Sequence, residues 1–361
     1  MKRAIVRATA LGCAVLVLSV SAPPASAAGT WRTVPTPFFW PNYGFSDISA
    51  EGAGSVWISG VQGSFCIQWM PMTPCVVHSD GNPVVRRWDG TRWREYPITG
   101  WTGQGRMGAI ESGGGQTWVQ GFGFDMPDQR YLARFDGRAF VPAAPPAGTN
   151  AVALLRSNPA GMRIVTWTDE GRHAVHRRTG DTWTREELPA DLRWVNDLRF
   201  RTATDGWAVG MTEPAPNTYG GEEYPAIAHW DGTSWTSVPP HIESGREERL
   251  ARVAPVAADE VWATTRKSVV RWYGGSWTVV PSPGGIRRPR DLVVDGTGTL
   301  WLIAETDAGP SLIFRREGDA WQQVTIPSIT SVTNLAAVPG TDTLWGLAGN
   351  GTAPTVITTA P

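Results

Sequence analysis

The sequence predicts an all-β protein, a seven-bladed β-propeller with four-stranded antiparallel blades, because two aromatic series alternate strictly along the chain. In the first series a tight turn precedes an aromatic residue, and its members are Trp31, Trp93, Phe140, Trp183, Trp235, Trp277 and Trp321. The second series is a tryptophan in a short apolar strand, and its members are Trp57, Trp118, Trp167, Trp207, Trp262, Trp301 and Trp345. Each series has seven members, so we expect seven blades.

Each repeat divides into four strands, a to d, and the repeat at 250–281 shows the pattern most clearly. Strand a is expected at 250–256, strand b at 261–265, strand c at 268–272 and strand d at 276–280. Several repeats have Asp-Gly between strands c and d, as at Asp89-Gly90 and Asp231-Gly232. Asp-Gly between alternating strands predicts a hairpin with a type I′ turn. The repeat therefore predicts antiparallel blades built from consecutive hairpins.

The two ends of the chain complete one blade between them. The seventh repeat supplies strands at 332–337, 343–347 and 355–358 and then stops, whereas the matching fourth strand lies at 30–35. Pairing of these segments closes the ring and removes exposed sheet edges. The organisation expected is a signal peptide at 1–27 and a single propeller domain at 28–361, with blades at about 44–97, 105–142, 149–189, 195–239, 249–281, 289–327, and 332–361 plus 29–35.

Composition and the N-terminus indicate an exported, soluble protein. Lys2, Arg3 and Arg7 precede an apolar segment and an Ala-Ser-Ala cleavage site at 25–27, which predicts a secretory signal peptide of bacterial type. Loss of these three charges takes the formal net charge from −1 to −4. This balance favours neither nucleic acid nor an anionic membrane as partner. We expect a secreted monomer with no membrane insertion. Cys66 and Cys75, the two remaining cysteines, are expected to form a disulfide in a short loop.

The repeat resembles a known group of propellers. The segment from Leu250 to Pro281, with Trp262, Trp272 and Trp277, looks like a tectonin-type repeat. It is also similar to the secreted, tryptophan-rich, kelch-like propellers of actinobacteria. Tectonins bind glycans, so kinship with them would imply a lectin.

Four of the 20 tryptophans fall outside the structural positions of the repeat. Sixteen occupy strands b, c and d, where burial between blades explains them. The other four fall in loops joining strands b to c or strands d to a, all on one face. Loops on a rigid scaffold commonly bind ligands, so we expect a site on this face. Its candidate residues are Trp40, Tyr43, Trp69, Trp101, Trp194, Tyr219, Glu222, Tyr224, Arg246 and Arg288.

No catalytic or metal motif explains the sequence. Gly103 to Gly108 match G-x-G-x-x-G, but they precede a strand instead of a nucleotide-binding helix. His173 and His176 are three apart on a strand and point to opposite faces. No metal site and no cofactor are expected.

Three functions remain open. The first is a non-catalytic binding or scaffolding propeller that recognises carbohydrate or another extracellular macromolecule. The second is a propeller glycoside hydrolase or lyase that uses loop carboxylates such as Glu222 or Glu223 with Asp197. The third is an envelope module that binds other proteins.

Overall fold

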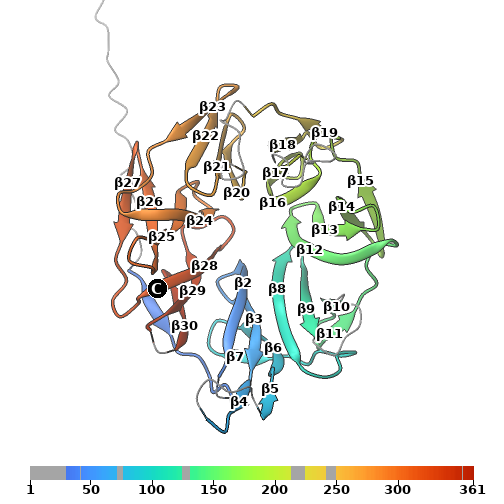
Figure 1. Cartoon of the computed structure of the whole chain (residues 1–361), viewed down its shortest axis with the longest axis vertical. Helices are drawn as coiled ribbons and strands as arrows, with labels where there is room; N and C mark the ends of the chain where they lie inside the picture. Colours follow the sequence, from blue (N-terminus) through green and yellow to red (C-terminus); the bar gives the residue numbers. More distant parts are fainter. Residues whose placement is uncertain are drawn as a thin grey trace, which may run out of the picture.

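The computed structural model describes residues 30–40, 42–70, 76–123, 131–212, 224–240, 249–351 and 353–361. Seven four-stranded antiparallel sheets stand around a common axis as the blades of a propeller (Figure 1). Every regular element in the described ranges is a strand, which confirms the predicted fold class. In those ranges no helix has the length and apolar character needed to span a bilayer.

Each of the first four blades consists of consecutive strands a to d, with strand a nearest the axis. Blade 1 contains β2 (Gly44–Gly52), β3 (Ser55–Gln62), β6 (Asn82–Trp88) and β7 (Trp93–Glu95). Blade 2 contains β8 (Gly105–Gly113), β9 (Gln116–Gly123), β10 (Tyr131–Phe135) and β11 (Phe140–Pro142). Blade 3 contains β12 (Thr149–Asn158), β13 (Gly161–Thr168), β14 (His173–Thr179) and β15 (Thr182–Glu186). Blade 4 contains β16 (Trp194–Thr202), β17 (Asp205–Met211), β18 (Pro225–Trp230) and β19 (Trp235–Ser237).

The remaining blades repeat this order, and one additional hairpin interrupts blade 1. Blade 5 contains β20 (Arg252–Ala257), β21 (Glu260–Thr264), β22 (Val269–Tyr273) and β23 (Ser276–Val280). Blade 6 contains β24 (Ile286–Val294), β25 (Leu300–Thr306), β26 (Ser311–Glu317) and β27 (Ala320–Val324). Blade 7 contains β28 (Ser331–Ala337), β29 (Leu344–Gly349), β30 (Pro354–Thr358) and β1 (Arg32–Val34). Between strands b and c of blade 1, β4 (Phe65–Ile67) pairs with β5 (Val77–Ser79).

The ring is closed by the first described strand of the chain. β1 pairs antiparallel with β30, and Val34 lies opposite Val356. Val34 and Trp31 are buried, and Trp31 packs edge-on against Trp301 of blade 6 at 6.2 Å between ring centroids. The N-terminal segment therefore supplies both a sheet edge and part of the core.

Tryptophans of strand b fill the spaces between neighbouring blades. Trp207 of blade 4 lies 5.1 Å from Trp272 of blade 5, measured between ring centroids. Trp345 of blade 7 lies 5.9 Å from Trp88 of blade 1 in the same way. Burial of such large rings contributes strongly to stability, because each removes 150–250 Å² from water. The tryptophans that repeat in the sequence are thus the residues that form the core between blades.

Blade 3 departs from the predicted series. Trp167 was expected at the strand-b position, but the position that faces the next blade is occupied by Arg163. Arg163 pairs with Arg177 of strand c, as Trp118 pairs with Arg134 in blade 2. Trp167 lies four residues farther along β13 and is 39% exposed. Trp167 does lie in strand b, as predicted, but the prediction that it is buried between blades was wrong, because Arg163 occupies that position.

The predicted c–d hairpins with Asp-Gly form in blades 1 and 4, but their turns are not type I′. Positive φ occurs at Gly90 (99°) and Gly232 (104°), and not at the aspartate before each glycine. The carboxylate of Asp231 instead accepts hydrogen bonds from the backbone N–H groups of Thr233 (2.7 Å) and Ser234 (2.8 Å). These bonds lower the pKa of Asp231 to about 2. An Asx turn stabilised by the side chain therefore replaces the expected backbone geometry.

Candidate functional site

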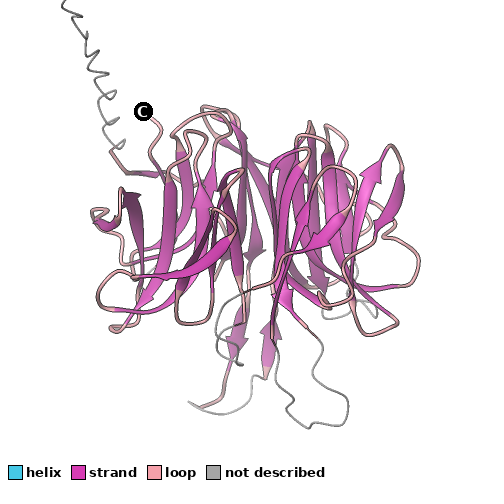
Figure 2. Ribbon diagram, turned by 90° about the horizontal axis from the view of Figure 1, so that it is seen from above, coloured by secondary structure: helices cyan, strands magenta, loops and turns pink. Residues whose placement is uncertain are grey.

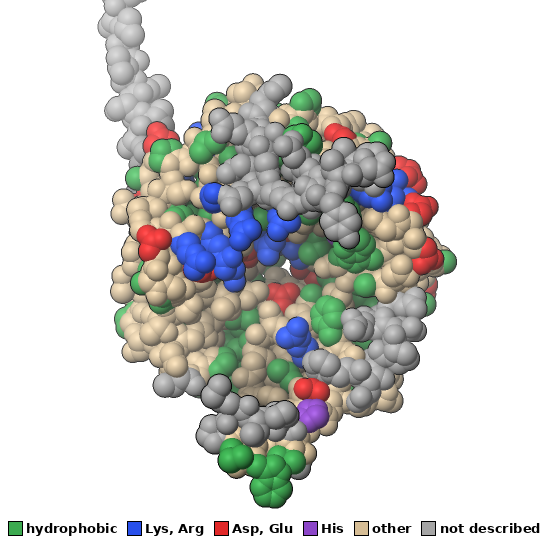
Figure 3. All heavy atoms as spheres, viewed as in Figure 1, with side chains coloured by type: hydrophobic (Ala, Val, Ile, Leu, Met, Phe, Trp, Pro, Cys, Tyr) green, Lys and Arg blue, Asp and Glu red, His purple; other side chains and the backbone are tan. Residues whose placement is uncertain are grey.

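The b–c and d–a loops open on one face of the ring, which we call the loop face. Strand b ends there and strand a begins there, so the start of every innermost strand borders the channel opening on this face. Figure 3 views the molecule from this side and shows Lys and Arg side chains gathered beside a hollowed centre. The candidate site is built from these strand starts and the turns next to them.

Arginines of blades 5 and 6 form one wall of the opening. A cavity of about 530 Å³ is lined by Arg249, Arg252, Arg266, Arg288 and Arg290, together with Asp291 and Asn334. Arg287 lies beside them in β24 and ion-pairs with the same carboxylate as Arg288, Glu305. We call these six arginines the arginine mouth. Among the residues named here, only Asp291 and Glu305 oppose their charge.

Three of these arginines share one carboxylate. Arg288 Nε donates to Glu305 Oε2 at 2.6 Å, while Arg287 and Arg290 approach Glu305 at 3.3 and 3.8 Å. The hydrogen bond from Arg288, followed by the charges of its neighbours, holds the pKa of Glu305 below its ordinary value. The side chains of Arg287 and Arg290 remain 65% and 49% exposed. One carboxylate cannot neutralise three guanidinium groups, so this wall attracts anions.

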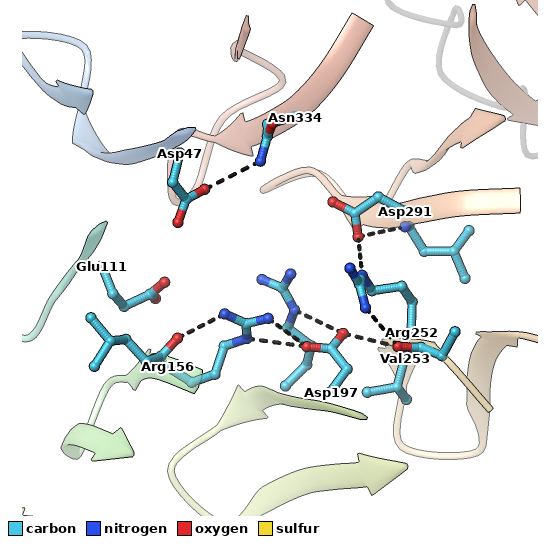
Figure 4. A network of polar contacts seen from close by, with 12 residues as sticks. Asp47, Glu111, Arg156, Asp197, Arg252, Val253, Asp291 and Asn334 are labelled. Atoms are coloured by element: carbon cyan, nitrogen blue, oxygen red, sulfur yellow. Dashed lines mark hydrogen bonds and ion pairs between the residues drawn. The ribbon is translucent and has the colours of Figure 1, made fainter. Parts of the chain in front are cut away.

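Below the mouth, polar side chains of the innermost strands link neighbouring blades across the channel (Figure 4). Arg156 of blade 3 donates to Asp197 of blade 4 at 2.6 Å. Asp197 in turn accepts from the backbone N–H of Val253 in blade 5 at 3.2 Å, and Arg252 approaches Asp291 of blade 6 at 3.5 Å. This network fixes the strands that carry the arginine mouth.

Blade 1 joins the same ring of contacts. Asp47 accepts from Asn334 Nδ2 of blade 7 at 3.3 Å and from the backbone N–H of Ile110 in blade 2 at 3.1 Å. Burial raises the pKa of Asp47 to about 6. Burial alone would also raise the pKa of Asp197, but the charges of Arg199 and Arg156 hold it well below the usual range. Asp47 and Asp197 thus occupy equivalent positions in their blades, but the pKa of Asp47 is raised whereas that of Asp197 is lowered.

Of the predicted aromatic candidates, Trp40 and Trp69 have the most exposed side chains. Trp40 is 62% exposed and Trp69 is 83% exposed, and both lie near the β4–β5 hairpin. Tyr224 is also exposed, in the b–c connection of blade 4. These residues lie on the loop face.

Three other candidates are packed against the scaffold. Trp101 is half-buried, with its ring 5.1 Å from that of Tyr131 and its Nε1 donating to the Gly103 carbonyl at 3.0 Å. Tyr43 stacks on Phe39 at 4.7 Å. Trp194 is half-buried at the start of β16. The contacts of these three residues position loops. The remaining described candidate, Arg288, lies in the arginine mouth.

Several predicted residues lie outside the described ranges. They are Tyr219, Glu222, Glu223 and Arg246, which were predicted for the loop face, Cys75 of the predicted disulfide, and the predicted signal peptide at 1–27. Cys66 lies in β4 opposite His78, and its pairing with Cys75 stays a prediction. In the described part of the chain, no cluster of three or more His, Cys, Asp or Glu residues could hold a metal ion.

Of the arginine mouth, the predicted site residues included only Arg288, and Trp167 was assigned to the core between blades and not to this face. Trp167 packs edge-on against His173 at 4.3 Å, and burial lowers the pKa of this histidine to about 4. Arg249, Arg252 and Arg266 are brought together by the pairing of β20 with β21 in blade 5, and the ring places them beside Arg288 and Arg290 of blade 6. A signal was present in the segment Arg287-Arg288-Pro289-Arg290.

Comparison with known proteins relates this chain to others through its propeller fold. No protein-family model and no curated protein matches the chain. Among solved structures, YCF48 bound to D1 peptide is similar over 93% of this chain and 98% of that one, with 14% identity and a TM-score of 0.57. YCF48 from Cyanidioschyzon merolae is similar over 91% of this chain and 98% of that one, with 15% identity and a TM-score of 0.56.

Propellers within larger proteins are also similar. A puromycin-hydrolyzing peptidase of Mycobacterium tuberculosis is 16% identical over 91% of this chain, with a TM-score of 0.60. This chain covers 54% of that peptidase. The extracellular domain of a hybrid two-component system protein from B. thetaiotaomicron is 9% identical over 91% of this chain and 39% of that one, with a TM-score of 0.53. At these identities the likeness shows the fold alone.

Proposed function

We propose that this protein is a secreted, non-catalytic binding propeller whose arginine mouth captures an acidic, extended peptide segment of an extracellular partner. The observation that carries the proposal is the shared use of Glu305 by Arg287, Arg288 and Arg290. Guanidinium groups form paired hydrogen bonds with carboxylates, so unneutralised arginines favour a ligand that brings its own carboxylates.

The form of the opening supports an extended ligand. The arginines lie beside a cavity of about 530 Å³ at the channel, which a side chain or a chain terminus would fill. YCF48, which has a similar fold, is bound to a peptide. Both carboxylates of the mouth are held by arginines, which suits an ion-pair network better than a general acid.

The test is titration of a fluorescent oligoglutamate peptide with the chain from residue 28, the form expected after export. The variant Arg287→Gln/Arg290→Gln removes two exposed charges from the mouth. A matched control, Arg94→Gln/Arg138→Gln, removes two exposed arginines on the opposite face, one in β7 beside the c–d turn of blade 1 and one in the c–d turn of blade 2. We expect about tenfold weaker binding for the mouth variant and no change for the control. Binding should also weaken as salt rises.

Equal affinity of both variants, or no saturable binding of oligoglutamate, would overturn the proposal. A neutral oligosaccharide that binds saturably and is not displaced by oligoglutamate would assign the face to carbohydrate instead. Turnover of a polysaccharide would favour the hydrolase or lyase.

A further inference from the structure

A second feature of the loop face lies at its edge, away from the arginine mouth. The β4–β5 hairpin stands out from the ring (Figure 2). Its apolar side chains and those of the neighbouring N-terminal loop face outward, and we call them the hairpin patch. The patch consists of Phe38, Trp40, Phe65, Ile67, Trp69 and Val76, which are between 44% and 83% exposed.

The hairpin is attached firmly at its root. Asn42 Nδ2 donates to the Ser64 carbonyl at 2.8 Å, and Ser64 Oγ donates to the Asn42 carbonyl at 2.8 Å. A Cβ added at Gly63 would lie 3.5 Å from the Cβ of Trp40, so this tryptophan lies against the root. On the other strand, the backbone N–H of Gly105 in blade 2 donates to the Gly81 carbonyl at 3.0 Å. The patch is thus held in one orientation relative to the ring.

The composition of the hairpin is unusual for a surface element. The segment from Gly63 to Ser79 contains no Asp, Glu, Lys or Arg. Soluble monomers rarely expose large contiguous apolar patches unless these contact a partner or a membrane. Trp and Phe side chains on and beside a projecting element suit the boundary between lipid headgroups and acyl chains.

The net charge of the whole chain does not favour an anionic membrane, but the positive charge gathered on the loop face (Figure 3) does match an anionic surface. Arg106 is exposed and lines a cavity of about 480 Å³ at the hairpin root, together with His78 and Asp80. The arginine mouth opens on the same face, so both features can meet one flat surface. A convex apolar element needs a complementary cavity in a protein partner, whereas a bilayer accepts it without one.

We propose that the hairpin patch is an interfacial membrane anchor, which inserts among the headgroups of an anionic bilayer while the ring stays outside. The ring would then lie with its loop face toward the lipid. This inference does not depend on the acidic-peptide ligand, because insertion rests on apolar residues outside the arginine mouth and the mouth adds only electrostatic attraction to the bilayer. It also differs from a membrane span, since only side chains of the hairpin and the adjoining loop enter the interface.

The experiment is co-sedimentation of the chain from residue 28 with vesicles. One set contains equal parts phosphatidylglycerol and phosphatidylcholine, and the other contains phosphatidylcholine alone. The variant Ile67→Ser/Trp69→Ser removes two exposed side chains of the patch. The matched control, Tyr273→Ser/Val279→Ser, removes an aromatic and an aliphatic side chain of similar exposure from β22 and β23.

We expect the unaltered chain to partition onto the anionic vesicles and more weakly onto phosphatidylcholine. The hairpin variant should partition about tenfold more weakly on the anionic vesicles, and the control should match the unaltered chain. Oligoglutamate titration of the hairpin variant should be unchanged, which separates this proposal from the arginine mouth. Thermal unfolding of each variant checks that the ring is intact.

Two results would overturn the anchor. One is that the unaltered chain stays in the supernatant at about millimolar lipid, where interfacial anchors partition. The other is equal partitioning of hairpin variant and control. A protein partner that binds through Ile67 and Trp69 while vesicles do not bind would replace the bilayer with a protein cavity.

Discussion

Arg163 and Glu186 form a buried ion pair within blade 3, at the position where the other six blades have a tryptophan. Arg163 Nε lies 3.0 Å from Glu186 Oε2, and both side chains are almost fully buried. The guanidinium group lies 4.3 Å from the ring centroid of Phe200 in blade 4. Trp235 Nε1 also donates to Glu186 at 3.1 Å. A charged pair therefore fills the space between two blades that an indole ring fills elsewhere.

Removing one partner of this pair should destabilise the ring strongly. Glu186→Gln leaves the charge of Arg163 buried without compensation, so we expect a loss of about 3–5 kcal/mol in the free energy of unfolding. Urea unfolding at neutral pH measures it. Glu317→Gln is the control, because its partner Arg315 lies 3.5 Å away and Glu317 is 53% exposed. The control should lose at most about 1 kcal/mol. Equal losses of unfolding free energy in the two variants would show that burial does not determine how much the ion pair contributes to stability.

The fold could be predicted because the aromatic residues that repeat in the sequence are the same residues that pack between blades. Every strand-d aromatic in the series is buried or half-buried, and the chain ends pair as the missing strand requires. Arg163 could not be predicted, since its role depends on Glu186 and Trp235, which belong to other strands. Trp167 provided a misleading marker in the same strand. A residue type identifies a core position only while each blade uses the same type.

For the candidate site, the sequence could predict only the face of the ring on which it lies. Strand connectivity alone places Trp40, Trp69 and Trp101 on one side of the ring. The sequence does not show which of these side chains packs inward, because Trp101 contacts Tyr131 only after blade 2 has folded. The channel network was missed for a related reason. Asp47 looks like an ordinary polar position of a strand, and Asp197 was considered only as a partner of Glu222 or Glu223, whereas in the folded ring it is buried and held by Arg156 and Arg199.

The stability of the ring should fall as pH rises through the titration of Asp47. Its folded pKa of about 6 lies above its ordinary value of 3.8, so the folded state binds the extra proton between these values. The stabilisation is fully present below about pH 4 and is lost as pH rises through 6. The shift corresponds to about 3 kcal/mol.

Asp47→Asn isolates this effect, because asparagine does not titrate. The free energy of unfolding of the variant, minus that of the unaltered chain, should increase by about 3 kcal/mol between pH 4 and pH 7. Urea unfolding over this range measures the difference and cancels the other carboxylates. A difference that is independent of pH would show that Asp47 is not protonated in the folded ring at pH 4–6.

Substitution by alanine should destabilise the protein at one tryptophan of the loop face and have little effect at another. Trp101→Ala removes a half-buried ring from its contact with Tyr131, so we expect a loss of about 2 kcal/mol in the free energy of unfolding. Trp69→Ala removes a ring that is 83% exposed and should change it by less than about 0.5 kcal/mol. Chemical denaturation of both variants checks this. Similar values for the two would mean that Trp101 does not stabilise its loop.

Deletion of residues 28–36 should destabilise all seven blades and not blade 7 alone. The deletion removes β1, leaves β30 as an open edge, and takes away the buried side chains of Trp31 and Val34. Because Trp31 also packs on Trp301, blade 6 loses core as well, and we expect a loss of about 5 kcal/mol or more.

The matched control for this deletion is Arg32→Ala. Arg32 is exposed, and its guanidinium group donates to the carbonyls of Ala360 and Pro361, both at 2.9 Å. Its loss should cost less than about 1 kcal/mol, because the strand pairing remains. Thermal unfolding of both proteins separates the contributions, and the deletion should keep a single transition at a lower temperature. If the deleted chain unfolds at the temperature of the unaltered one, the ring does not depend on its N-terminal strand. Two separate transitions would show instead that only blade 7 is loosened, since a ring whose blades share one aromatic core unfolds as a unit.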